Sequence, residues 1–248
     1  MRPRDGWAIV VGVTFVLAAC SSGPSVADLP TPTTPSSDPG SAAQDVWAFE
    51  HFTDLEPGTY FIDPDLDPDT SLRVEFEIPA EGWQAWTGAA KFSEVGHVGV
   101  SVTDVSNLVS HGCRDHSWAD PPVGPSVDDL ATALADLAPF RVTSPVKDVT
   151  IYGYDGEYLE LTVPKLPVDG AGRFTGCEDK SLMSWVAPFD TPPDDAFYGY
   201  TGPGYTEEFW ILDVDGSRLM VAAERSPDPP SQDLAELRDI LDSILIEP

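Results

Sequence analysis

The sequence predicts an α+β domain in which one antiparallel sheet of about six to eight strands is covered by two main amphipathic helices. Several segments alternate apolar and polar residues with the period of a strand, and two of these segments contain hairpin patterns. Two other segments carry apolar residues at helical spacing. Because each helix must bury its apolar stripe on a flat apolar surface, an antiparallel sheet is the expected partner.

The clearest strand is segment 72–78, LRVEFEI, in which apolar and charged residues alternate. Side chains two positions apart lie on the same face of a strand. One face is therefore expected to carry Leu72, Val74, Phe76 and Ile78.

Two hairpins are predicted at Asp-Gly pairs that lie between strand-like runs. Asp155-Gly156 lies within 148–164, and Asp215-Gly216 lies within 207–224. We expect type I′ turns at both pairs, because glycine accepts the positive φ that such turns require and aspartate tolerates it.

Two helices are predicted by apolar spacing and by a capping signal. Segment 126–138 begins with Ser126 as N-cap and has Asp129 three residues later. Its apolar stripe consists of Val127, Leu130, Leu134 and Leu137. In segment 231–247 the corresponding stripe consists of Leu234, Leu237, Leu241 and Ile244.

The N-terminus has the pattern of an export signal. Arg2 and Arg4 precede an apolar run at 7–19, which is shorter than the roughly 20 residues that a membrane-spanning helix needs. Residues 17–20, Leu-Ala-Ala-Cys, resemble the lipobox of bacterial lipoproteins. That resemblance implies that 1–19 are removed and that Cys20 carries a diacylglyceryl anchor, which holds the protein on the outer face of the cytoplasmic membrane. The alternative is an ordinary signal peptide that contains a cysteine.

Residues 20–44 form the predicted tether between the anchor and the folded part. This stretch is rich in Pro, Ser and Thr and has no apolar periodicity, so it is expected to be an extended spacer, either a plain linker or a surface stalk. No similar boundary follows, and 45–248 is predicted to be a single domain.

The charge balance restricts the partners. The chain has 13 Lys and Arg against 42 Asp and Glu, a formal net charge of -29. Nucleic acid is excluded as a partner, because its binding requires a cationic face, and anionic lipid headgroups repel the domain. We expect a monomer whose contact with the membrane is the lipid on Cys20, with an unknown protein or small molecule as its ligand. No cofactor is predicted.

Four blocks of the chain resemble one known group of proteins. The blocks are LEPGTYFIDPD (55–65), PPVGPSVDDLATAL (121–134), YDGEYLELTVP (154–164) and FWILDVDGSRLMV (209–221). They resemble uncharacterised actinobacterial surface lipoproteins. The resemblance implies a PsbP-like α/β sandwich and no assigned activity.

Reactive side chains are concentrated at 110–118, where His111, Cys113, Asp115 and His116 lie within six positions. Such a set can bind zinc or form a nucleophile. However, an exported cysteine normally has a disulfide partner, and once Cys20 is lipidated only Cys113 and Cys177 remain. A Cys113–Cys177 disulfide is predicted, with zinc at His111, Cys113 and His116 or a free thiol as the alternatives.

No metal site is predicted at the acidic stretch 63–69. Asp63, Asp65, Asp67 and Asp69 could attract calcium, but Pro68 and Val74 stand where an EF-hand requires glycine and a bidentate glutamate. An exposed turn explains these residues. The hairpin explains Asp213 and Asp215 equally well.

Aromatic residues provide candidates for a ligand cleft. If they converge, a sugar, peptide or lipid could bind to Trp83, Trp86, Tyr198, Tyr200 and Tyr205. Core packing is the alternative. The common hydrolase, nucleotide-binding and HExxH motifs are absent from the sequence. The predicted function is therefore a non-catalytic binding or interaction module, and the alternative is a zinc- or thiol-dependent hydrolase using 111–116.

Overall fold

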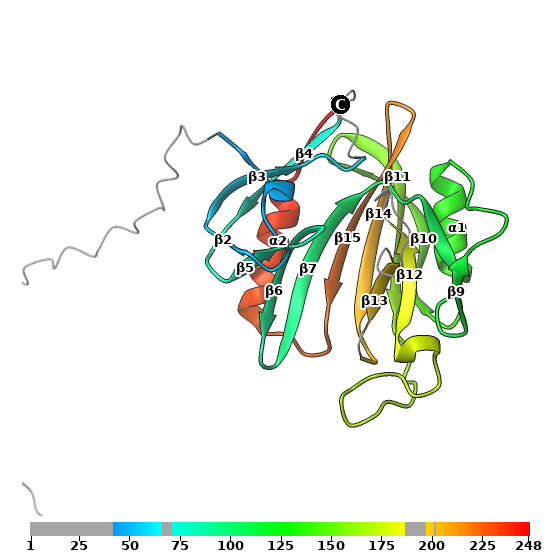
Figure 1. Ribbon diagram of the computed structural model, residues 1–248. Coiled ribbons are helices and arrows are strands. Elements are labelled where there is room, and N and C mark those ends of the chain that lie inside the picture. Colours follow the sequence, from blue (N-terminus) through cyan, green and yellow to red (C-terminus); the bar gives the residue numbers. More distant parts are fainter. Residues whose placement is uncertain (1–41, 66–70, 187–196, 201) are drawn as a thin grey trace, which may run out of the picture. The chain divides into compact units, whose positions relative to one another are not determined.

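The computed structural model describes residues 42–65, 71–186, 197–200 and 202–248, and in this part the chain is mostly β (Figure 1). Its strands form three sheets, accompanied by two α-helices. The described residues all belong to one compact unit, Asp38–Pro248. The predicted α+β sandwich of one sheet under two main helices is wrong, because the described strands form three sheets and much of the layer that covers the main sheet consists of strands.

The central sheet has eight strands in the order β10-β11-β14-β15-β7-β6-β5-β2, and all neighbours are antiparallel. The strands are β2 (Asp54–Leu55), β5 (Trp83–Ala85), β6 (Gly88–Ser93), β7 (Gly96–Thr103), β10 (Arg141–Ile151), β11 (Tyr154–Thr162), β14 (Thr206–Val214) and β15 (Ser217–Arg225).

One face of the central sheet packs against a four-stranded sheet and helix α2 (Ser231–Ser243). This sheet consists of β1 (Gln44–Asp45), β3 (Gly58–Ile62), β4 (Arg73–Ile78) and β16 (Leu245–Glu247), and the short helix η1 (Val46–Ala48) follows β1. The predicted alternation in 72–78 is confirmed, because Val74, Phe76 and Ile78 are buried in this core. β1 begins at Gln44, one residue before the predicted start of the domain.

The opposite face packs against the third sheet and helix α1 (Val127–Asp136). The third sheet is ordered β13 (Phe197–Tyr200), β12 (Leu182–Val186), β8 (Asn107–His111) and β9 (Asp115–Trp118). The short helix η2 (Glu178–Lys180) precedes β12. Two separate cores therefore lie on the two sides of the central sheet.

Both predicted helices form. At the start of α1 the backbone N–H of Asp129 donates to Ser126 Oγ at 3.1 Å, and the N–H of Ser126 donates to Asp129 Oδ2 at 3.0 Å. This capping box satisfies backbone donors that a helix N-terminus leaves free. The predicted tail of the second helix is wrong: α2 ends at Ser243, and Leu245–Glu247 is a strand that pairs with β4.

The hairpin at Asp215-Gly216 is confirmed, with φ of 52° and 91° between the paired residues Val214 and Ser217. The turn predicted at Asp155-Gly156 is wrong. It lies three residues earlier, at 152–153, where Tyr152 and Gly153 have φ of 56° and 89°, and Asp155-Gly156 belongs to β11. Gly156 is required for another reason, because a Cβ there would overlap the carbonyl oxygen of Ile211 on β14.

Within the described ranges, no helix has the length and apolar character needed to cross a membrane.

Candidate functional site

Strand alternation assigns each side chain to one of two faces of the central sheet, here named the α1 face and the α2 face after the helix that packs on each. On β15, Met220 and Ala222 belong to the α1-side core, whereas Leu219 and Val221 belong to the α2-side core. Glu224 is two residues beyond Ala222 and therefore points to the α1 face.

A pair of acidic residues is buried on the α1 face. Glu207 of β14 lies directly opposite Glu224 of β15 in the antiparallel register, and their exposed fractions are 2% and 8%. Glu207 Oε1 accepts a hydrogen bond from Trp185 Nε1 at 3.2 Å. Glu207 Oε2 is buried and has no hydrogen-bond partner. We call these two residues the carboxylate pair.

The environment of Glu207 favours its protonated form. Burial raises the pKa of Glu207 well above its usual range, and the nearby charge of Glu224 raises it further. The hydrogen bond from Trp185 lowers this pKa but does not offset the other two effects. Glu207 therefore keeps its proton at pH values at which an exposed carboxyl is ionised.

Glu224 contacts two polar side chains. His97 Nε2 of β7 lies 3.4 Å from Glu224 Oε2, and the Tyr198 hydroxyl is hydrogen-bonded to the same side chain. Gly99, which pairs with Glu224 across β7 and β15, leaves room for it, since a Cβ on Gly99 would lie 3.0 Å from Glu224 Oε1. The two carboxyls of the pair thus differ in their polar contacts: Glu224 contacts His97 and Tyr198, whereas Glu207 contacts only Trp185 through Oε1 and leaves Oε2 without a hydrogen-bond partner.

A continuous series of rings leads from the surface to the carboxylate pair, and we call it the aromatic row. At its outer end Phe52 and Phe92 are 55% and 45% exposed, with ring centroids 5.9 Å apart. Phe92 lies 5.3 Å from His97, and His97 lies 4.9 Å from Tyr205. In full, the row consists of Phe52, Trp86, Phe92, His97, Tyr205, Tyr200, Tyr198 and Trp185.

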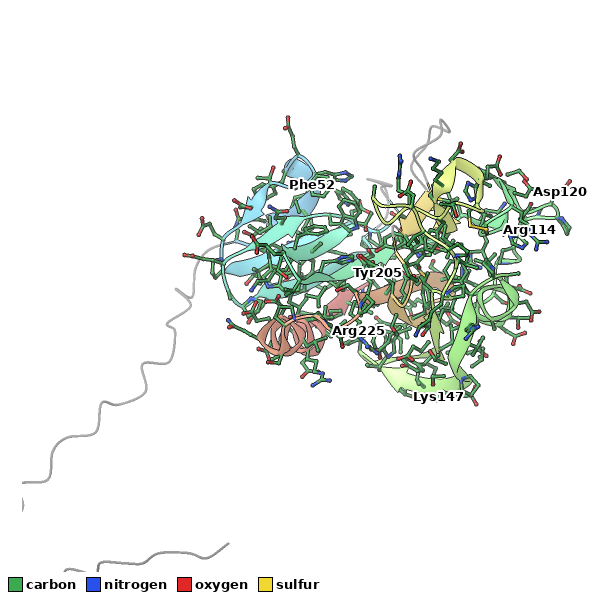
Figure 2. The ribbon with its side chains drawn as sticks, turned by 90° about the horizontal axis from the view of Figure 1, so that it is seen from below. Phe52, Arg114, Asp120, Lys147, Tyr205 and Arg225 are labelled. Atoms are coloured by element: carbon green, nitrogen blue, oxygen red, sulfur yellow. A yellow bond between two sulfur atoms is a disulfide. The ribbon has the colours of Figure 1, made fainter. Side chains whose placement is uncertain are left out.

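The inner end of the row is buried beside the carboxylate pair. Trp185 and Tyr198 stack with centroids 4.6 Å apart and planes 11° apart. Figure 2 shows Tyr205 in the middle of the described residues and Phe52 near their edge, at the outer end of the row.

Four of the five aromatic residues proposed from the sequence belong to this row. Tyr198, Tyr200 and Tyr205 contact one another, and Trp86 contacts Phe52 and Phe92 at the outer end. Trp83 does not belong to it. It is fully buried on the α2 face, where its Nε1 donates to Glu236 Oε2 at 3.0 Å.

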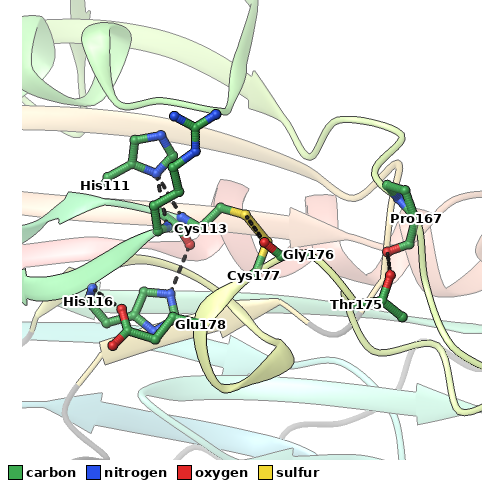
Figure 3. Close-up of a disulfide and its surroundings, with 10 residues drawn as sticks. His111, Cys113, His116, Pro167, Thr175, Gly176, Cys177 and Glu178 are labelled. Atoms are coloured by element: carbon green, nitrogen blue, oxygen red, sulfur yellow. Dashed lines mark hydrogen bonds between the residues drawn. A yellow bond between two sulfur atoms is a disulfide. The ribbon is translucent and has the colours of Figure 1, made fainter.

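The predicted disulfide between Cys113 and Cys177 is confirmed (Figure 3). It joins the turn between β8 and β9 to the residue before η2, and the backbone N–H of Glu178 donates to the Cys113 carbonyl at 2.8 Å. Because the sulfur of Cys113 is bonded to Cys177, it cannot serve as a nucleophile or zinc ligand in this state.

The two neighbouring histidines have local roles. His111 Nδ1 accepts hydrogen bonds from the backbone N–H groups of Cys113 and Arg114, at 3.1 and 3.2 Å. His116 Nε2 lies 3.1 Å from the Gly112 carbonyl. Figure 3 shows both rings beside the turn that carries Cys113.

No cluster of three or more potential metal ligands occurs in 42–65, 71–186, 197–200 and 202–248. Asp63 and Asp65 are within these ranges, whereas Asp67 and Asp69 are outside them. Cys20 also lies outside the described residues.

A groove of about 860 Å³ lies elsewhere, between the start of α1 and the ends of β10, β11 and β14. It is lined by exposed carboxylates, including Asp128, Asp148 and Asp213, and by Arg218. Because these carboxylates are open to water, solvent screens their mutual repulsion. The groove has shifted groups of its own, since burial raises the pKa of Glu157 and lowers that of Arg218. We place the candidate site at the carboxylate pair because its two glutamates are more deeply buried and lie beside the aromatic row.

The chain matches no protein-family model, and neither a curated protein nor a solved structure is significantly similar to it. The function must therefore be argued from the side chains themselves.

Sequence reasoning missed six residues of the aromatic row and the carboxylate pair: Phe52, Phe92, His97, Trp185, Glu207 and Glu224. One signal could have found the pair. In the 207–224 hairpin, Glu207 shares a face with Phe209 and Ile211, so a carboxylate interrupts an otherwise apolar face.

Proposed function

We propose that the protein is an exported, lipid-anchored binding protein that takes up a small ligand along the aromatic row. The anchor is the lipid on Cys20, and the relationship to actinobacterial surface lipoproteins is part of the same proposal. The carboxylate pair at the inner end of the row is the polar group that orients the ligand.

The observation that carries the proposal is the continuity of the row. It runs from rings that are about half exposed to a buried carboxylate oxygen that has no donor. Ligand sites are usually apolar and aromatic surfaces with a few convergent polar groups, and perturbed titratable groups concentrate at such sites. A structural core has no need of an unpaired buried acceptor, which costs stability.

The hydrolase alternative at 111–116 has no comparable support. Its thiol is in the disulfide, and His111 accepts two backbone hydrogen bonds. We do not pursue it.

Native mass spectrometry of the full chain, purified from its own membranes, tests the binding role. We expect the wild type to carry a small molecule and the Phe92→Ser variant to lose it. Phe92 is 45% exposed, so its replacement leaves the core intact. Val142→Ser, which changes a 40% exposed apolar residue on β10, is the matched control and should keep the ligand. A wild type without any adduct, or equal adducts in all three proteins, contradicts the proposal.

The anchor is tested by Cys20→Ala. This variant should accumulate as a precursor or lose its partition into detergent, because the acyl chains supply the membrane affinity, at about 0.8 kcal/mol per buried CH₂. If a mature-sized Cys20→Ala protein still enters the detergent phase, the lipid anchor is wrong.

A further inference from the structure

We infer that the carboxylate pair binds a small organic ammonium ion, whose positive charge offsets the negative charges of the two buried carboxylates. This inference rests on the proposed function, because it names the ligand class of the same site. Two features point to it: the unpaired Oε2 of Glu207, whose residue is 98% buried, and the position of Glu224 directly opposite.

The first argument is charge. His97 contacts Glu224, and no Lys or Arg of the described residues forms an ion pair with either carboxylate. With both carboxyls ionised, the pair would carry two negative charges side by side in a buried place. This arrangement is costly, and a proton on Glu207 relieves it when no ligand is bound.

The other titratable groups that face Glu207 cannot remove this charge. Tyr198 of β13 stays protonated, because burial and the two glutamates raise the pKa of its hydroxyl. Tyr205, the residue before β14, packs against His97 with ring centroids 4.9 Å apart. An ammonium group can supply the missing charge and can also donate an N–H hydrogen bond to Glu207 Oε2. An uncharged ligand can donate the hydrogen bond but cannot supply the charge.

The second argument is the lining. Rings surround the pair, with Trp185 donating to Glu207, Tyr198 bonded to Glu224 and Tyr205 against His97. Aromatic rings near a bound cation add to its attraction when a ring face is turned toward it. The formal net charge of -29 adds a long-range attraction for cations and repels anions.

The experiment uses the full chain and two probes with the same carbon chain, butylammonium and butanol. The indole N–H resonance of Trp185 is followed by NMR, because this group donates to Glu207. We expect butylammonium to bind at least about tenfold more tightly than butanol. Equal binding of the two probes overturns the inference.

Two neighbouring glutamates provide the variants. Glu207→Gln keeps an acceptor for Trp185 but removes the ionisable group, and it should weaken butylammonium binding by about tenfold or more while leaving butanol unchanged. Glu208→Gln makes the same change of charge one residue away, on the α2 face, where Glu208 Oε2 accepts from the Tyr158 hydroxyl. It should bind both probes as the wild type does. Equal losses in the two variants would mean that only the general negative charge matters, and would overturn the specific site.

Proton release on binding distinguishes the specific site from general electrostatic attraction of cations by the net negative charge. Calorimetry in two buffers of different ionisation enthalpy should show that butylammonium binding releases about one proton in the wild type and none in Glu207→Gln. At pH values below the pKa of Glu207 in the free protein, the affinity for butylammonium should increase by about tenfold for each unit by which the pH is raised. Binding without proton release contradicts the inference.

The outcomes also separate this inference from the proposed function. If both probes bind alike and both are weakened by Phe92→Ser, the aromatic row binds ligands and only the ammonium class is wrong. If neither probe shifts the Trp185 resonance, the ammonium inference fails, and the native mass spectrum of the wild type alone decides the proposed function.

Discussion

The two faces of the central sheet each bury a pair of acidic side chains, but they neutralise them differently. On the α2 face, Lys91 Nζ lies 2.6 Å from Glu236 Oε2 and 3.2 Å from Asp233 Oδ1. On the α1 face, Glu207 and Glu224 have no such lysine among the described residues, and Glu207 Oε2 has no partner. In both places a buried tryptophan donates its Nε1–H to a glutamate.

The pKa values of Glu236 and Glu207 are therefore shifted in opposite directions. Burial tends to raise the pKa of Glu236, but hydrogen bonds from Lys91, Gln232 and Trp83 outweigh it and leave that pKa lowered. The pKa of Glu207 is raised, because burial and Glu224 act without a cation to oppose them. The α2-side group is therefore satisfied within the chain, whereas the α1-side group is completed only by a proton or a ligand.

The largest expected effect on stability is at the α2 face, where Lys91 contacts both acidic side chains. Lys91→Met should destabilise the domain by about 3–5 kcal/mol, because it leaves Asp233 and Glu236 buried without their cation. Chemical denaturation at neutral pH measures this loss. A loss below about 1 kcal/mol would show that water already solvates these carboxylates, and the comparison would break.

The disulfide is expected to matter next. Replacing Cys113 and Cys177 by serine should cost about 2–4 kcal/mol, because the cross-link restricts the unfolded chain. Thermal unfolding with and without reductant checks it. The wild type should lose stability in reductant and the double variant should not; equal behaviour would mean that the bond is not formed in solution.

Glu207→Gln should stabilise the ligand-free protein at pH 8 by about 1–2 kcal/mol, since an amide has no buried charge to neutralise. The folded state keeps the Glu207 proton to higher pH than the unfolded chain does, so wild-type stability falls as pH rises from the ordinary carboxyl range through the raised pKa. The variant lacks this fall. The difference between the two proteins, measured from pH 4 to 8, should therefore grow with pH; a constant difference contradicts the raised pKa.

The smallest expected effect is a difference in stability between the variants Trp83→Phe and Trp185→Phe. Trp83→Phe breaks a hydrogen bond to Glu236, whose lowered pKa favours the ionised form, whereas Trp185→Phe breaks one to Glu207, whose raised pKa favours the protonated form. Hydrogen bonds to charged groups are worth about 1.5–3 kcal/mol and neutral ones about 0.5–1.5 kcal/mol. Both tryptophans are fully buried, so the loss of packing is similar. Trp83→Phe should cost about 1 kcal/mol more, and the reverse order would show that Glu207 is ionised.

Local features of the fold could be predicted from the sequence alone. The alternation in 72–78, the capping box at Ser126 and Asp129, and the turn at Asp215-Gly216 depend on residues within a few positions of one another. The Cys113–Cys177 bond followed from counting cysteines on the expectation that the chain is exported. The first three predictions succeeded because they depend on local chain geometry. The disulfide prediction succeeded because only two cysteines were left to pair.

Only the tertiary structure decided the layers and the site. Short strands such as β12 and β13 have too few residues for a periodic signal, and they become strands because they find partners far along the chain. The different surroundings of Trp83 and Trp86 were also decided by tertiary packing: the two residues are three positions apart, but they lie on opposite faces. Glu207 and Glu224 are ordinary acidic residues in the sequence; the register of β14 and β15 and the cover formed by Trp185 and Tyr198 bury them together, and burial is what changes their chemistry.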